Sequence, residues 1–291
     1  MNIEVNPDMI NQKTYKKFID IEDVLNSKSK IIKKITPGFV FRIFRKILHE
    51  EEINQAIENN RSKYGPDFAK AIIDEFGARI SIKGQIDISQ KSRLIMVSNH
   101  PLGGLDGLAL ISIIGKIRSD LKFIVNDLLL NVENLRSIFL PVNKVGSSPK
   151  DALKVINDAF TSDHLLLSFP FGLVSRRKKG IIHDLEWKKS FITKAKQTKR
   201  DIIPVHIDGR NSNFFYRLAN LRTFLGIKLN IEMFFLVNEM YKQKNQNITI
   251  TFGKPIPIST FNNKYSESEW AEKLRKFVYE LPSDPNKSFI Q

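Results

Sequence analysis

The chain has 291 residues, a formal net charge of +15 and no cysteine, which excludes disulfide bonds, thiolate metal sites and a cysteine nucleophile. Its apolar fraction of 42% is enough for a packed core but too low for a protein with many membrane-spanning helices. The sequence shows no secretory signal and no apolar run of the roughly 20 residues that a spanning helix needs, so we expect a cytoplasmic protein.

The positive charge is compatible with nucleic acid, an anionic membrane surface or an acidic protein as partner. The sequence contains no zinc-finger spacing, no RNA-recognition motif and no continuous basic helix of the leucine-zipper type. We therefore expect no nucleic-acid partner, whereas a lipid surface and an acidic protein remain as candidates.

Residues 1–77 are predicted to form a helical region, and residues 78–291 an α/β domain. Apolar positions in residues 14–35 fit one or two helices. Residues 39–48 are dense in aromatic side chains, with three cations on one side of a helical projection. This pattern is typical of an interfacial helix whose apolar side chains enter a lipid layer, and equally of a helix packed on the following domain. Both interpretations stay open.

Apolar strand-like segments alternate with helical ones along the rest of the chain. Strands are predicted over 78–83, 94–97, 121–125, 128–130, 138–142, 164–169, 202–207 and 248–252. Helices are predicted over 66–76, 105–117, 148–160, 187–196 and 267–280, with another beginning at 211–213. This alternation predicts an α/β fold with a mostly parallel central sheet flanked by helices.

The stretch from Arg93 to Leu108 reads as a strand, a tight loop and a helix, with His100 and Asp106 six positions apart. A neutral imidazole can accept a proton from a hydroxyl, and a carboxylate on its other nitrogen fixes the tautomer and stabilises the imidazolium. Taken alone, the pair is also compatible with a loop histidine beside a helix-capping aspartate. Its position at a strand end, where parallel sheets place their chemistry, favours a functional pair.

A second polar loop, from Phe169 to Arg176, follows the apolar strand predicted at 164–169. Because both loops follow strands of a parallel sheet, we expect them at the same sheet edge. The basic residues 177–179 that come next are interpreted as a solvated run or a docking patch for an acidic partner. His183 and Asp184 are adjacent, and adjacent side chains of an extended chain point in opposite directions, so we do not expect a second pair. His206 is interpreted as a packed histidine.

Four segments in order resemble the motifs of the glycerophosphate and lysophospholipid acyltransferase superfamily. Asn99–Gly107 resembles the first motif, with its histidine and aspartate, and Pro141–Lys144 the second. Phe169–Arg176 resembles the third, and Ile203–Val205 the fourth. The resemblance covers about residues 80 to 255, and four ordered motifs are far more specific than one.

Two positions depart from the family pattern. The aspartate usually follows the histidine by five residues, and here by six; Gly103 and Gly104 can absorb the extra residue, because glycine adopts φ values closed to other residues. Phe171 stands where the family commonly has a glutamate that holds the acceptor, which argues against glycerol phosphate as acceptor. The chain more closely resembles the ornithine-lipid and glycine-lipid O-acyltransferases, often labelled hemolysin-like. The residues that carry this nearer resemblance are Ser175, Arg176, Asp184, Trp187, Phe191 and the run 203–216.

The resemblance implies an O-acyltransferase in which His100 is the general base and Asp106 orients it. It places Lys144, Ser175 and Arg176 at the anionic group of the acceptor. We expect backbone N–H groups of Gly103, Gly104 or Gly172 to stabilise the oxyanion. We expect no metal and no bound cofactor. Because the chain has no cysteine, we expect direct transfer rather than a ping-pong route.

The implied acceptor is the hydroxyl of an N-(3-hydroxyacyl) amino-acid lipid, and the implied donor an acyl carrier protein or coenzyme A thioester. The implied location is the inner face of the cytoplasmic membrane, with peripheral attachment. One alternative keeps the fold but has a lysophospholipid or 1-acylglycerol-3-phosphate as acceptor. Another is a non-catalytic, basic membrane-binding protein on the same scaffold.

Overall fold

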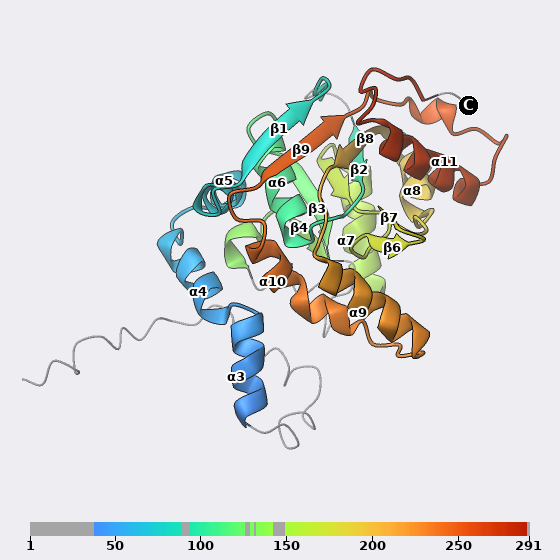
Figure 1. The fold of residues 1–291 in the computed structure, drawn as a ribbon. Coiled ribbons are helices and arrows are strands. Elements are labelled where there is room, and N and C mark those ends of the chain that lie inside the picture. Colours follow the sequence, from blue (N-terminus) through green and yellow to red (C-terminus); the bar gives the residue numbers. More distant parts are fainter. Residues whose placement is uncertain (1–37, 89–92, 126–128, 131, 142–148, 290–291) are drawn as a thin grey trace, which may run out of the picture.

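A computed structural model describes residues 38–88, 93–125, 129–130, 132–141 and 149–289 (Figure 1). The helix predicted within residues 14–35 and the second motif residue Lys144 lie outside these ranges. Among the described residues, no helix is both long enough and apolar enough to cross a lipid bilayer.

The described helices are α3 (Gly38–Ile47), α4 (Glu50–Asn59), α5 (Gly65–Glu75), α6 (Gly104–Ile114), α7 (Pro149–Thr161), α8 (Ser190–Thr198), α9 (Asn213–Phe224), α10 (Leu236–Tyr241) and α11 (Glu267–Glu280). Short 3₁₀ turns are η3 (Glu133–Leu135), η4 (Ile231–Phe235) and η5 (Ile258–Thr260). The strands are β1 (Arg79–Lys83), β2 (Leu94–Ser98), β3 (Leu121–Val125), β4 (Phe139–Pro141), β5 (Leu165–Ser168), β6 (Arg176–Lys178), β7 (Ile181–His183), β8 (Asp201–Ile207) and β9 (Asn247–Phe252).

A seven-stranded sheet in the order β1-β9-β8-β2-β5-β3-β4 forms the centre of the protein. Neighbouring strands are parallel except β8 and β9, which are antiparallel. Every residue of β2, in the middle of the sheet, is buried, as an unbroken apolar run predicts. The predicted α/β fold with a mostly parallel sheet is therefore confirmed.

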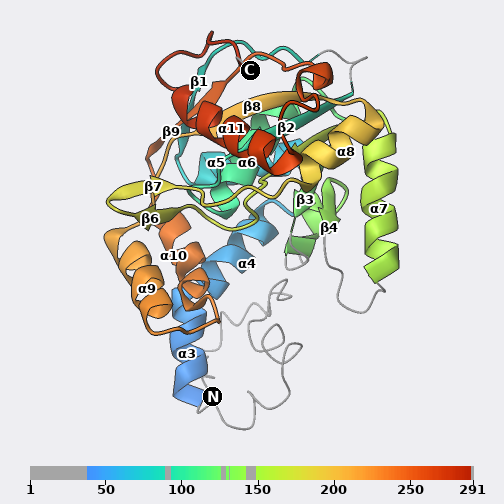
Figure 2. The ribbon, with the colours of Figure 1, turned by 90° about the vertical axis from the view of Figure 1, so that its right-hand side faces the viewer.

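Helices cover both faces of this sheet (Figures 1 and 2). On one face, α5 and α6 share an apolar core with alternate residues of the central strands, among them Met96 and Leu167. On the other face, α7, α8 and α11 pack over Ile95 and Leu166. The period-two alternation of a strand thus supplies one core to each helical layer.

Two sequence predictions of secondary structure are corrected by the structure. Leu129 and Leu130 lie in a 3₁₀ turn and not in a strand, because the chain reverses there and the Val132 amide donates to the Leu129 carbonyl. Trp187 precedes α8 instead of opening it, since its indole N–H donates to the Asp184 carboxylate three residues back.

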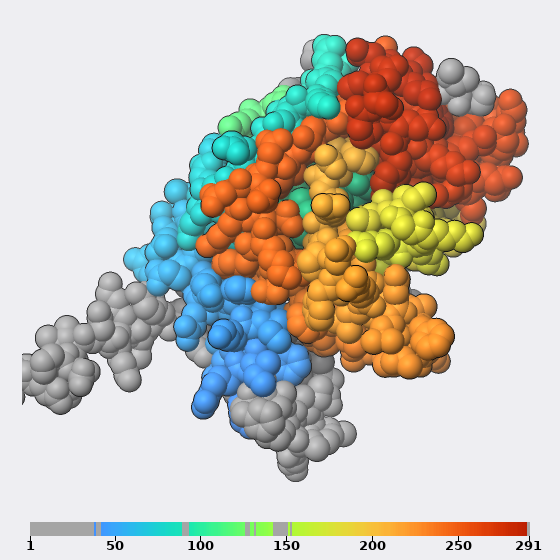
Figure 3. All heavy atoms as spheres, in the orientation of Figure 1, coloured from blue at the N-terminus to red at the C-terminus, as the bar shows by residue number. Residues whose placement is uncertain are grey.

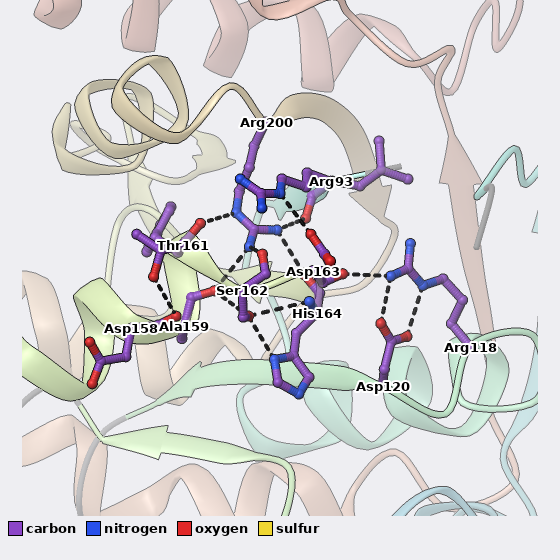
Figure 4. Close-up of polar contacts among 12 residues, drawn as sticks. Arg93, Arg118, Asp120, Asp158, Ala159, Thr161, Ser162, Asp163, His164 and Arg200 are labelled. Carbon is purple, nitrogen blue, oxygen red and sulfur yellow. Dashed lines mark hydrogen bonds and ion pairs between the residues drawn. The ribbon is translucent and has the colours of Figure 1, made fainter. Parts of the chain in front are cut away.

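Buried arginines close the edge of the sheet where β2 and β5 begin (Figure 4). The guanidinium of Arg200 is fully buried and donates to the carbonyl groups of residues 94, 159, 160, 162 and 164. Burial lowers the pKa of Arg200 to about 10. Arg118 pairs with Asp120 and also donates to the Asp163 carbonyl. These contacts hold the starts of the strands, which leaves the opposite edge for the polar loops.

Helix α5, just before the predicted boundary at residue 77, packs closely on α6 and contributes Phe68 and Ile72 to its core. The division into residues 1–77 and 78–291 stays a prediction, with α5 sharing the core of the second part.

Candidate active site

His100 and Asp106 form a hydrogen-bonded pair where β2 ends and α6 begins. His100 Nδ1 donates to Asp106 Oδ2 at 2.9 Å, and the Leu102 amide donates to the same oxygen at 2.8 Å. The Asp106 carboxylate is fully buried, and burial raises its pKa, while the hydrogen bond from His100 acts in the opposite direction. With Nδ1 carrying the proton, Nε2 is the ring nitrogen that can accept one.

Gly103 accounts for the six-residue spacing. It adopts φ of 72° and is the N-cap of α6, a conformation that residues with a Cβ rarely reach. The Asp106 amide donates back to the Gly103 carbonyl across this turn. The loop therefore folds back, and the carboxylate in the first turn of α6 meets the histidine that precedes it.

Phe169, at the end of β5, fixes the other side of the imidazole. Its ring stacks on His100 with centroids 4.0 Å apart and planes 15° from parallel. The His100 side chain keeps 18% of its surface exposed. Because β2 and β5 are parallel neighbours, the first and third motifs meet at one sheet edge, as the sequence predicts.

Asp184 connects these two loops through hydrogen bonds. One carboxylate oxygen accepts from Ser175 Oγ at 2.6 Å and from the His100 amide at 3.3 Å. The other accepts from the Trp187 indole at 2.9 Å. Burial raises the pKa of this carboxyl, and the hydrogen bonds from Ser175 and Trp187 oppose that effect. Asp184 therefore positions the backbone of the histidine loop.

Arg176 and Ser175, predicted at the acceptor's anionic group, are both buried and bonded within the protein. Arg176 donates to the Val174 carbonyl at 2.6 Å and pairs with Glu232 Oε1 at 2.8 Å. Glu232, completely buried, also pairs with Arg222 of α9 at 2.9 Å. The binding role of Ser175 and Arg176 stays a prediction, and Lys144 lies outside the described residues.

The predicted oxyanion donors differ in their surroundings. The Gly172 amide donates to the Phe169 carbonyl within its own turn. Gly103 and Gly104 stand at the N-terminus of α6, where leading N–H groups have no intrahelical acceptor. The helix start is therefore the better placed source of an oxyanion donor.

A cavity of about 430 Å³ opens beside the histidine loop, with Asn99 and Pro101 in its wall. Its lining also includes Ser175, His206 and Tyr279, with Asp208 and Arg210 from the loop after β8. Burial lowers the pKa of His206 to about 4, so this histidine is neutral at pH 7, as expected of a packed histidine.

Sequence reasoning missed the β6–β7 hairpin and Glu232. Arg176–Lys178 pairs with Ile181–His183, so the basic run 177–179 lies in a hairpin, with Lys178 and Lys179 exposed. A usable signal is Lys179-Gly180, a two-residue turn in which both residues have positive φ. Glu232 has no local signal, since its partners are 56 and 10 residues away in the sequence.

A sequence profile of the family described as "Acyltransferase" matches residues 23–286. The chain belongs to the acyltransferase family. The enzyme is 44% identical over 264 residues to the lyso-glycine lipid O-acyltransferase of Bacteroides thetaiotaomicron, covering 90% of this chain and 97% of the relative. It is 43% identical to the protein of that name from Phocaeicola vulgatus, covering 90% and 95%. These relatives confirm the resemblance to the glycine-lipid branch.

Among solved structures, the acyltransferase is similar to the 1-acyl-sn-glycerophosphate (LPA) acyltransferase PlsC of Thermotoga maritima. The two share 17% sequence identity and align with a TM-score of 0.46, over 76% of this chain and 83% of that one.

Proposed function

We propose that the enzyme transfers a fatty acyl group from a thioester to the 3-hydroxyl of an N-(3-hydroxyacyl) amino-acid lipid, with glycine as the amino acid. The observation that carries the chemistry is the 2.9 Å hydrogen bond from His100 to the buried Asp106. Support for the acceptor comes from two relatives named lyso-glycine lipid O-acyltransferase, each matched over nearly its whole length.

His100 Nε2 accepts the proton of the acceptor hydroxyl while its oxygen attacks the thioester carbonyl. A tetrahedral oxyanion forms at that carbon, and N–H groups at the start of α6 stabilise it. Asp106 stabilises the imidazolium that results. The C–S bond then breaks, the imidazolium returns its proton to the departing thiolate, and the products are an ester and a free thiol.

The donor in this proposal is an acyl carrier protein or coenzyme A thioester. No acyl-enzyme is needed, because the chain has no cysteine and His100 activates the acceptor directly. Phe171, where the family commonly has glutamate, packs against the core below α8 and α11. An apolar side chain there supports an acceptor other than glycerol phosphate.

Since the acceptor is a lipid, the proposal includes peripheral attachment to the inner face of the cytoplasmic membrane. The net charge of +15 supports this location, because that face carries anionic lipids.

A competition between acceptors tests the proposal. The purified enzyme would receive an acyl thioester and equal amounts of N-(3-hydroxyacyl)glycine and lysophosphatidic acid, with products identified by mass spectrometry. Separate reactions with carrier protein and coenzyme A thioesters identify the donor. We expect the diacylated glycine lipid to form, and N-acylglycine without the 3-hydroxyl to give no product. Acylation of lysophosphatidic acid instead would show that this lipid, and not the glycine lipid, is the acceptor. No acylation of either lipid would contradict the proposed reaction.

A further inference from the structure

Helix α9 buries one side and exposes a large apolar stripe on the other. Phe215, Tyr216 and Ala219 are buried against the protein. Phe214, Leu221 and Phe224 follow at helical spacing on the opposite side and are 50%, 54% and 86% exposed. Such contiguous exposed apolar side chains are unusual on a soluble surface and mark a binding face.

The stripe continues beyond α9 and onto α3. In the loop that follows α9, the exposed apolar residues are Leu225, Ile227 and Leu229. Ring contacts through η4 join the two helices: Phe214 lies against Phe235, and Phe234 against Phe44 of α3. Ile43 of α3 is 52% exposed. Figures 2 and 3 show α3 and α9 at the same end of the molecule. We define the docking face as Ile43, Phe214, Leu221, Phe224, Leu225, Ile227 and Leu229.

Every charged residue of the segments that carry the docking face is basic. Residues 209–231 contain no aspartate or glutamate, and neither do residues 38–47. Arg42, Lys46, Arg217 and Lys228 are exposed there. Exposed apolar side chains bordered by cations alone complement one surface in particular, an anionic lipid bilayer, whose headgroups attract the cations while its acyl chains accept the apolar groups.

We propose that the docking face inserts into the anionic surface of a membrane, with α9 and the 225–229 loop as its main contact and α3 beside them. The inference rests on the proposed function, in that the acceptor is a lipid of that membrane. The helices α3 and α9 then contact lipid together, as one continuous face.

The docking face is linked to the active site by direct contacts. Glu232 joins Arg222 of α9 to Arg176, the last residue of the third motif. A Cβ placed on Gly103, in the histidine loop, would lie 3.5 Å from Leu236, the first residue of α10. The docking face and the histidine loop are therefore connected through η4 and α10.

Site-specific labelling gives a sharp test, because the natural chain has no cysteine. The variants F224C, L229C and I43C would each carry one environment-sensitive fluorophore. L153C is the control, since Leu153 is 55% exposed and α7 lies on the opposite side of the molecule from α9 (Figure 2). The full-length proteins are mixed with vesicles of equal parts phosphatidylglycerol and phosphatidylcholine. We expect blue-shifted emission, quenched by brominated acyl chains, from the three labels on the docking face and not from position 153. No shift at any of the three would overturn the proposal.

Polar substitutions separate docking from catalysis. In the double variant F224Q/L229Q we expect vesicle binding about tenfold weaker or more, and in R217Q/K228Q a loss on anionic vesicles alone. L153Q should bind as the wild type does. Acyl transfer to acceptor dispersed in detergent should persist in the docking variants and fall only with acceptor in vesicles.

Three further outcomes distinguish failure of the docking face from failure of the proposed reaction. Unchanged vesicle binding in F224Q/L229Q, with the wild type active, would overturn the docking face and leave the proposed reaction intact. If that variant instead converts a dimer to a monomer in sedimentation, the face belongs to a second copy of the chain. A wild type that binds vesicles through the labelled positions but acylates no acceptor would contradict the proposed function alone.

Discussion

In the proposed reaction the Asp106 carboxylate has to be ionised to support His100, yet its burial favours the neutral form. Burial raises its pKa above the ordinary value of 3.8, although His100 and the Leu102 amide oppose the rise. A raised folded-state pKa means that the folded protein binds the proton more tightly than the unfolded chain. As pH rises from the pKa of the unfolded chain to the raised pKa of the folded protein, ionisation of this carboxyl lowers the free energy of unfolding. The loss persists at higher pH, where the ionised carboxylate stands beside His100.

The variant D106N separates the effect of Asp106 on acyl transfer from its effect on stability. We expect acyl transfer to fall by roughly 10³- to 10⁴-fold, because an amide nitrogen in place of the carboxylate oxygen disfavours the tautomer with Nδ1 protonated. We expect its free energy of unfolding to equal or exceed that of the wild type at pH 7, with the difference shrinking as pH falls toward 4 and the wild-type carboxyl becomes protonated. Urea unfolding at several pH values measures this. A variant less stable than the wild type at pH 7, with the difference unchanged by pH, would contradict the argument.

At the residue scale, what the sequence could predict was local. His100, Asp106 and Gly103 lie within one loop, so their meeting follows from a strand, a turn and a helix in succession. The contact of Asp184 with the His100 amide was not predictable, because the two residues are 84 positions apart in the sequence. A hydrogen bond of that range depends on the packing of the hairpin, which no local pattern specifies.

At the scale of elements, Glu232 of η4 connects α9 to the β6–β7 hairpin by ion pairs. Two arginines share this buried carboxylate. Burial lowers the pKa of Arg176, and the charge of Glu232 counters the effect. Removing the shared carboxylate would leave the buried Arg176 and the largely covered Arg222 without a counter-charge, a far larger penalty than the loss of an exposed pair.

The variant E232Q should therefore be destabilised by about 3 kcal/mol, and amides of α9 and the hairpin should exchange with solvent faster than those of α8. Urea unfolding and hydrogen exchange measure the two effects. The matched control is E272Q, because the Glu272 side chain is 40% exposed in its pair with Arg275 of α11; its loss of stability should stay below about 1 kcal/mol. Equal losses of unfolding free energy in the two variants would show that the shared, buried carboxylate stabilises the fold no more than an exposed pair does.

The β6–β7 hairpin was not predicted from the sequence pattern. Residues 177–179 were interpreted as a solvated run or a docking patch; Lys178 and Lys179 are exposed, but Arg177 is half-buried and stacks over Tyr216 at 4.8 Å. A long basic side chain can cover apolar surface when a partner meets its charge. The helices and central strands were predictable, in contrast, because their apolar periodicity records which face is buried.

At the scale of the whole molecule, the sheet order explains why the site forms where it does. β2 lies between β5 and β8, so the loop with His100 is flanked by the third motif on one side and by the loop after β8 on the other. The parallel order was predictable from alternating strands and helices. The antiparallel pairing of β8 with β9 was not, because it depends on how the chain returns after α9 and α10.

The proposed reaction depends most on His100 as the base that takes the proton of the acceptor hydroxyl. The most direct test is the rate of formation of diacylated glycine lipid by purified wild type and H100A, followed by mass spectrometry. H183A serves as the control, because among the described residues the His183 ring contacts the backbone carbonyl of Asp184 and Arg275, and not the Asp184 carboxylate. We predict that H100A lowers kcat/KM by about 10³-fold while remaining folded, and that H183A keeps most of its activity. Full acyl transfer by a folded H100A would contradict the mechanism.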